Sequence, residues 1–163
     1  MSVARPVPIV TRTKDELAGV VDLFGALTRA ELARALAELA FKQGKAVDES
    51  AFESVIAAAV DDYYLVEGEY DGASVLASGP VAFPAVPENG EDLPHIMDVP
   101  DRGVDRTALA ERARSRLREE AEAVVEAGDE ERAGYLLDVS YDLEAWGPVE
   151  TDAVRERLDS VLD

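Results

Sequence analysis

Apolar residues in the first third of the chain recur at spacings of three and four positions, which predicts amphipathic helices. Gly25 and Gly44 separate three such runs. Thr13 and Thr28 each precede a glutamate by three residues, which is typical of a capping box, and Asp48 is expected to cap the third run. The sequence therefore predicts helices over residues 13–24, 28–43 and 48–62.

The periodicity changes after residue 62. Tyr63 to Val66 form a short β-prone run, and Ser74 to Leu76 form another. Asp71-Gly72 lies between the two runs and is a turn signal. The sequence therefore predicts a β-hairpin over residues 63–78.

Prolines interrupt the pattern between residues 80 and 103, where five of the eight prolines of the chain fall. Proline has no amide donor and a fixed φ, so neither a helix nor a central strand is expected there. Apolar residues are nevertheless interspersed through this segment, which a free linker would not need. We expect an extended connector that packs on the core and buries Phe83, Leu93 and Ile96.

A helical pattern resumes after residue 104. A long helix is predicted to end near Gly128, and Asp129 is expected to cap the next helix. Gly147-Pro148 ends that helix, and Thr151 begins a last short one. The predicted fold class is mainly α with a small β-hairpin (α+β), divided into residues 1–79, a proline-rich connector over 80–103, and a C-terminal three-helix region over 104–163 packed on or beside the first part.

Three helices followed by a hairpin resemble a winged helix-turn-helix over residues 13–78. The resemblance implies DNA binding by the third helix in the major groove. That helix contains no lysine or arginine, and Glu67, Glu69 and Asp71 lie at the tip of the wing. Because DNA affinity comes largely from cations that neutralise phosphates, we expect this region to contact proteins instead.

The strongly negative charge of the chain indicates the salt concentration in which the protein works. Thirty-five acidic residues face sixteen basic ones, a formal charge of −19, and only Lys14, Lys42 and Lys45 are lysines. The whole chain resembles the short acidic proteins of an uncharacterised haloarchaeal family. The alternative is a moderately acidic mesophilic protein.

Two further features of the composition bear on location and chemistry. No stretch reaches the ~18 apolar residues of a membrane span, and the first ten residues have no apolar run of signal-peptide length. We therefore expect a soluble, cytoplasmic protein without membrane contact. The chain has no cysteine, which excludes disulfides and thiolate chemistry.

No candidate catalytic, cofactor or metal site emerges from the sequence, and we do not expect an enzyme. His95 is the single histidine, and Asp92, Asp98 and Asp101 lie near it. Their spacing matches no metal-ligand pattern, so an exposed loop histidine is the expectation. Paired carboxylates are abundant in so acidic a chain and do not indicate acid–base catalysis.

The candidate interaction surface consists of Tyr63, Tyr64 and Tyr70 around the hairpin together with Arg112 and Arg116 on the long helix. Aromatic residues and arginines anchor protein partners, although tyrosines also pack small sheets onto helices. Arg116 and Arg118 each precede a glutamate by four residues, so ion pairs within the helix are expected as well.

The sequence thus favours a non-enzymatic regulatory or adaptor protein that binds another protein, with its oligomeric state left open. The alternative is a winged-helix transcription regulator that binds DNA. That alternative needs a cationic surface assembled from distant parts of the chain, namely Arg29, Arg34, Lys42 and Lys45 with some arginines of residues 106–118.

Overall fold

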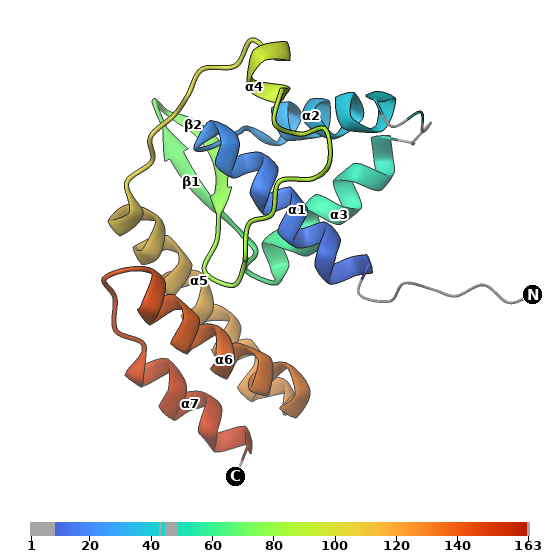
Figure 1. The fold of residues 1–163 in the computed structure, drawn as a ribbon. Helices are drawn as coiled ribbons and strands as arrows, with labels where there is room; N and C mark the ends of the chain where they lie inside the picture. The colour runs from blue at the N-terminus through green and yellow to red at the C-terminus, as the bar shows by residue number, and fades with distance from the viewer. Residues whose placement is uncertain (1–8, 43, 45–48, 163) are drawn as a thin grey trace, which may run out of the picture.

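The computed structural model describes residues 9–42, 44 and 49–162 and confirms the α+β class (Figure 1). The elements are α1 (Ile9–Phe24), α2 (Arg29–Lys42), α3 (Glu49–Asp61), β1 (Leu65–Tyr70), β2 (Ala73–Ser78), α4 (Leu93–Ile96), α5 (Arg106–Ala127), α6 (Glu130–Trp146) and α7 (Asp152–Leu162). Among these described residues, no helix is both long and apolar enough to cross a lipid bilayer.

The predicted helix ends are largely confirmed. The Thr28 hydroxyl accepts from the Glu31 amide at 3.1 Å, and the Glu31 carboxylate accepts from the Thr28 amide at 2.9 Å, which completes a capping box. The prediction for Thr13 was wrong, because α1 already begins at Ile9 and contains Thr13 in its interior. The predicted cap Asp48 lies outside the described residues.

The hairpin turns at the predicted dipeptide. Asp71 and Gly72 both have positive φ, 54° and 80°, which suits a two-residue hairpin turn. β1 and β2 pair antiparallel, with Leu65 opposite Ser78 and Tyr70 opposite Ala73. Leu27, between α1 and α2, adds a one-residue antiparallel bridge to Leu76.

The hairpin lies between two hydrophobic cores. Successive strand residues point to opposite faces of a sheet. Accordingly Leu65 and Leu76 are buried against helices α1–α3, whereas Val66 and Ala77 are buried against helices α5–α7. Figure 1 shows α5 passing under the hairpin, with α6 and α7 completing a three-helix layer beyond it. The apolar dipeptides of both strands are therefore explained by burial on both faces.

The connector runs across α1, as its apolar residues suggested, but it docks differently from the prediction. Leu93 and Met97 are buried, whereas Phe83 is 82% exposed and Ile96 is 47% exposed. The backbone of the connector also contacts α1: the Ala85 amide donates to the Asp15 carbonyl at 3.1 Å. The expectation that no helix forms here was also wrong, because Leu93–Ile96 form the single turn of α4 with proline in its first turn.

Gly19 allows this close approach of the connector to α1. A Cβ atom on Gly19 would overlap the carbonyl of Ala85. Alanine normally stabilises a helix interior by ~1 kcal/mol relative to glycine, but overlap with a backbone atom costs about 1–3 kcal/mol. Gly19→Ala should therefore lower the free energy of unfolding, measured by urea denaturation in molar KCl. Gly134→Ala on α6 is the matched control, because its Cβ would meet no atom within 4 Å and should leave stability equal or higher. Equal behaviour of the two variants would contradict the packing described.

Candidate functional site

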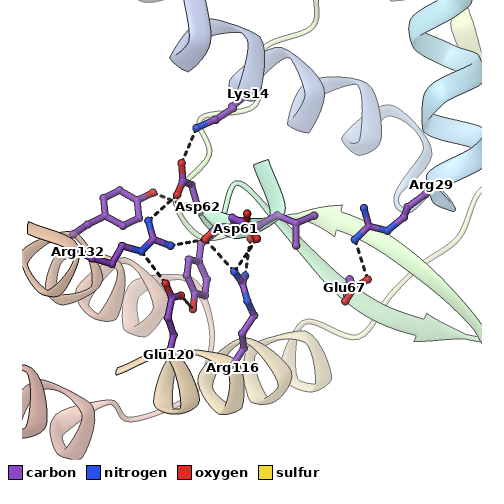
Figure 2. A network of polar contacts seen from close by, with 11 residues as sticks. Lys14, Arg29, Asp61, Asp62, Glu67, Arg116, Glu120 and Arg132 are labelled. Atoms are coloured by element: carbon purple, nitrogen blue, oxygen red, sulfur yellow. Dashed lines mark hydrogen bonds and ion pairs between the residues drawn. The ribbon is translucent and has the colours of Figure 1, made fainter. Parts of the chain in front are cut away.

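A network of polar side chains joins the C-terminal end of α3 to three other helices (Figure 2). The last carbonyls of a helix have no partner within the helix and carry partial negative charge. Arg116 of α5 donates to the carbonyls of Val60 and Asp61, at 2.6 and 3.0 Å. Arg132 of α6 donates to the Asp61 carbonyl at 2.8 Å. Two guanidinium groups from the C-terminal helices thus cap α3 from outside.

Asp62 is the centre of the ion pairs in this network. Its carboxylate accepts from Lys14 of α1 at 2.6 Å and from Arg132 at 2.8 Å. Arg132 also donates from Nε to Glu120 at 2.8 Å. Partial burial disfavours the charged carboxylate, but the hydrogen bonds from Lys14 and Arg132 outweigh it and hold the pKa of Asp62 below its ordinary value. The three parts of the chain that supply Lys14, Asp62 and Arg132 are therefore tied together at one carboxylate.

Tyr63 extends the network into the interior. Its side chain is fully buried and its φ is 68°. The hydroxyl donates to Glu120 at 2.9 Å, and the Arg116 guanidinium lies 4.2 Å above the ring centroid. Burial raises the pKa of Tyr63, so the hydroxyl remains a donor at neutral pH. Tyr135 similarly donates to the Asp62 carbonyl at 2.6 Å.

The structure brings three of the five predicted surface residues together. Tyr63, Arg112 and Arg116 line a pocket of about 150 Å³ between α3, β1 and α5. Arg112 donates to the Glu67 carbonyl of β1 at 3.2 Å. These groups are engaged in contacts within the molecule, and Tyr63 offers no exposed surface to a partner.

The other two predicted residues lie elsewhere. Tyr64 is half-buried, with Lys14 5.5 Å from its ring centroid. Tyr70 is exposed at the end of β1, away from the network. A partner surface formed by all five residues stays a prediction, because four of them are at least partly accessible and only Tyr63 is fully buried.

The ion pairs expected within α5 do not form among the described residues. Arg116 turns to α3, while its expected partner Glu120 binds Arg132. Glu122, the expected partner of Arg118, instead pairs with Arg157 of α7 at 2.8 Å. At Arg116 and Glu122, contacts between helices replace contacts along α5, because they satisfy the exposed carbonyls at the α3 end and link α5 to α7.

Sequence reasoning missed Lys14, Asp62, Glu120 and Arg132. Lys14 lies on α1, Asp62 directly follows α3, Glu120 lies on α5 and Arg132 lies on α6. No local sequence pattern relates the four residues. Each looks like an ordinary charged residue of an amphipathic helix or its flank. Their importance follows only from the packing of α5 and α6 against the end of α3.

The side chains of this site form a structural anchor, a network of ion pairs and hydrogen bonds that holds the end of α3 to α1, α5 and α6. Its carboxylates are paired with cations, and within the described residues no group of three or more histidine, aspartate or glutamate side chains is placed to hold a metal. His95 is exposed on α4. The arrangement fixes the position of α3 and the hairpin relative to α5 and α6.

Comparison with known proteins gives a family and no activity. One protein family's sequence profile, described as a family of unknown function (DUF7109), matches residues 15–163. The chain belongs to the DUF7109 family. Neither the curated proteins nor the solved structures give a significant match. The DUF7109 match spans both cores and the connector, and the observed order of helices and hairpin is compatible with a winged helix without identifying one.

Proposed function

We propose that this DUF7109 protein is a non-enzymatic regulatory or adaptor protein that acts through contacts with other proteins in the cytoplasm of a salt-accumulating archaeon. The observation that carries the proposal is the chemistry of the face that α3 turns to solvent. Over residues 51–61, where the side chains of α3 are described, the exposed ones are Ala51, Glu53, Ser54, Ala57 and Asp61. Small and acidic side chains suit a protein partner and repel a phosphate backbone.

Three of the arginines near α3 and the hairpin supply little free positive charge. Arg116 and Arg132 are used on the carbonyls at the end of α3, and Arg29 pairs with Glu67 at 3.1 Å (Figure 2). Each of these three arginines also forms an ion pair with a carboxylate, which offsets its charge. A further residue of the cationic surface considered above, Lys45, lies outside the described residues.

The alternative remains a winged-helix regulator that binds DNA. The observation that favours it is the one-residue Leu27–Leu76 bridge, which ties the segment between the first and second helices to the hairpin. A two-stranded hairpin with such a bridge, packed on three helices, is compatible with that architecture. The two proposals differ in one measurable property: DNA binding would depend on the basic side chains near α3, whereas binding of a protein partner would not.

Affinity capture at molar KCl tests the first proposal. The tagged full chain should recover a specific protein in stoichiometric amount from a native lysate, and that protein, when tagged in turn, should recover this chain. A fluorescent mixed-sequence DNA duplex should show no change in anisotropy. Recovery of the bait alone would contradict the proposal. Saturable duplex binding that weakens with added KCl and is lost in Arg29→Gln would support the DNA-binding alternative instead.

A further inference from the structure

A groove of about 380 Å³ opens where the end of β2 meets the end of α1 and the start of α5. Its walls come from the end of α1, the end of β2, the connector, the start of α5 and the last residue of α6. The lining is mainly polar, and its apolar part comes from Val104, Ala82 and Pro84 together with the largely buried Leu109 and Ala77. Val104 therefore offers a limited apolar surface beside polar groups.

One edge of the sheet is unpaired in this groove. The Leu27 and Leu76 backbones exchange two hydrogen bonds, at 3.0 and 2.7 Å, and Gly79 donates to the Tyr64 carbonyl on the other side of the strand. Because backbone groups alternate in direction along a strand, the Ser78 amide and carbonyl point the same way as those of Leu76. They face the groove, which Ser78 lines.

The residue expected to pair with Ser78 does not form backbone hydrogen bonds with it. Continuing the Leu27–Leu76 pairing by two residues would place Gly25 opposite Ser78. Gly25 instead has φ of +85° and donates to the Asp22 carbonyl at 3.3 Å. Among the described residues, no backbone group takes its place on Ser78. An open strand edge is a template for another strand.

Arg106 gives the groove a cation without a carboxylate partner among the described residues. Its guanidinium donates to the Trp146 carbonyl at 2.9 Å and stacks 4.3 Å from the centroid of the indole ring. Arg102, which also lines the groove, is by contrast paired with Glu31 at 2.7 Å. Asp22 is the single carboxylate among the lining residues and belongs to the α1 wall, whereas Arg106 belongs to the α5 wall. The remaining donors of Arg106 match a carboxylate by charge.

The geometry points to this groove as the docking site for an extended segment of a partner protein. The segment pairs its backbone with Ser78, seats an apolar side chain against Val104, and places a carboxylate on Arg106 beside Trp146. This is strand addition, in which backbone bonds give affinity and side-chain pockets give specificity. The inference rests on the proposed function, since it names the surface and the kind of partner.

Trp146 is the single tryptophan of the chain, so its fluorescence reports on the groove directly. Short linear peptides selected from a random display library against the full chain in molar KCl are the probes. We expect the selected peptides to combine apolar residues with aspartate or glutamate and to change the Trp146 emission saturably. Arg106→Gln should weaken their binding roughly tenfold or more, because it removes a charge-assisted contact.

Two proline variants separate the strand edge from general stability. Ser78→Pro removes the amide that faces the groove and leaves the β1–β2 ladder bonds in place, and it should also weaken binding roughly tenfold. Ser74→Pro makes the same change at an outward-facing position of β2 that does not line the groove, and it should bind as the parent chain does. Equal binding by all three variants, peptides that leave Trp146 emission unchanged, or selection of no peptide would overturn the inference.

The same variants distinguish failure of this inference from failure of the proposed function. A native partner captured equally by the parent chain, Ser78→Pro and Arg106→Gln would leave the proposed function standing and refute the groove. Loss of that partner in Ser78→Pro but not in Ser74→Pro would support both. Peptide binding in the groove without any native partner would support the groove chemistry and count against the proposed function.

Discussion

Replacing Arg132 by glutamine should lower the free energy of unfolding by about 2–3 kcal/mol. The change leaves the partly buried Glu120 carboxylate without a charged donor, and it leaves Asp62 with Lys14 alone. Arg132 holds Asp62, Glu120 and the Asp61 carbonyl at once, each at 2.8 Å. For a chain of this length the midpoint of thermal unfolding should fall by roughly 5–10 °C. Thermal and urea unfolding followed by circular dichroism in molar KCl measure the effect.

The matched control for this variant is Arg157→Gln. Arg157 also makes two hydrogen bonds of 2.8 Å to a carboxylate, Glu122, but both side chains are about half exposed. Exposed ion pairs contribute little and are screened by salt, so this variant should leave the midpoint almost unchanged. If both variants behaved alike, the network at the α3 end would be an ordinary set of surface charges and not an anchor.

Local signals in the sequence predicted most of the secondary structure. The capping box of Thr28, the left-handed Gly128 and the Asp129 cap act within one helical turn, and all three are observed where expected. The Asp71-Gly72 turn is equally local. Such features are predictable because the interacting atoms are only a few residues apart in the chain.

The connector shows where local reasoning failed. Apolar residues in a proline-rich segment indicated docking, which is observed, but not which side chains face inward. Leu93 is buried on the first core, whereas Phe83 is exposed and contacts α1 through its amide, which donates to the Asp15 carboxylate at 3.0 Å. An extended segment without a regular partner strand has no fixed alternation, so sequence offers no rule for its inward positions.

The candidate site could not be predicted from the sequence, for a different reason. The pairs Lys14–Asp62 and Arg132–Asp62 join residues 48 and 70 positions apart. With thirty-five acidic residues available, the sequence provides many equivalent partners for each cation. Which carboxylate is chosen depends on how α5 packs on β1 and brings α6 to the end of α3. Arg112 and Arg116 were singled out from the sequence, but their targets were not.

Raising KCl from dilute buffer to molar concentration should raise the thermal midpoint by roughly 10 °C or more, or about 3–5 kcal/mol for a chain of this size. The formal charge of −19 opposes compaction when counterions are scarce. At molar salt the screening length falls to ~3 Å, so repulsion between exposed carboxylates is largely removed. Thermal unfolding by circular dichroism across a KCl series at neutral pH measures this.

A sucrose series of equal osmolality separates screening from the strengthening of apolar burial. Sucrose is excluded from protein surfaces and favours burial, but it carries no charge and does not screen. The midpoint should therefore rise less in sucrose than in KCl.

The partly buried pairs of Asp62 should survive molar salt, because pairs shielded from solvent are screened much less than exposed ones. Salt would then remove the repulsion of the surface while leaving the anchor intact, so Arg132→Gln should lose a similar amount of stability at every KCl concentration at which it folds. A parent midpoint that stays constant between dilute buffer and molar KCl would rule out adaptation of this chain to high salt.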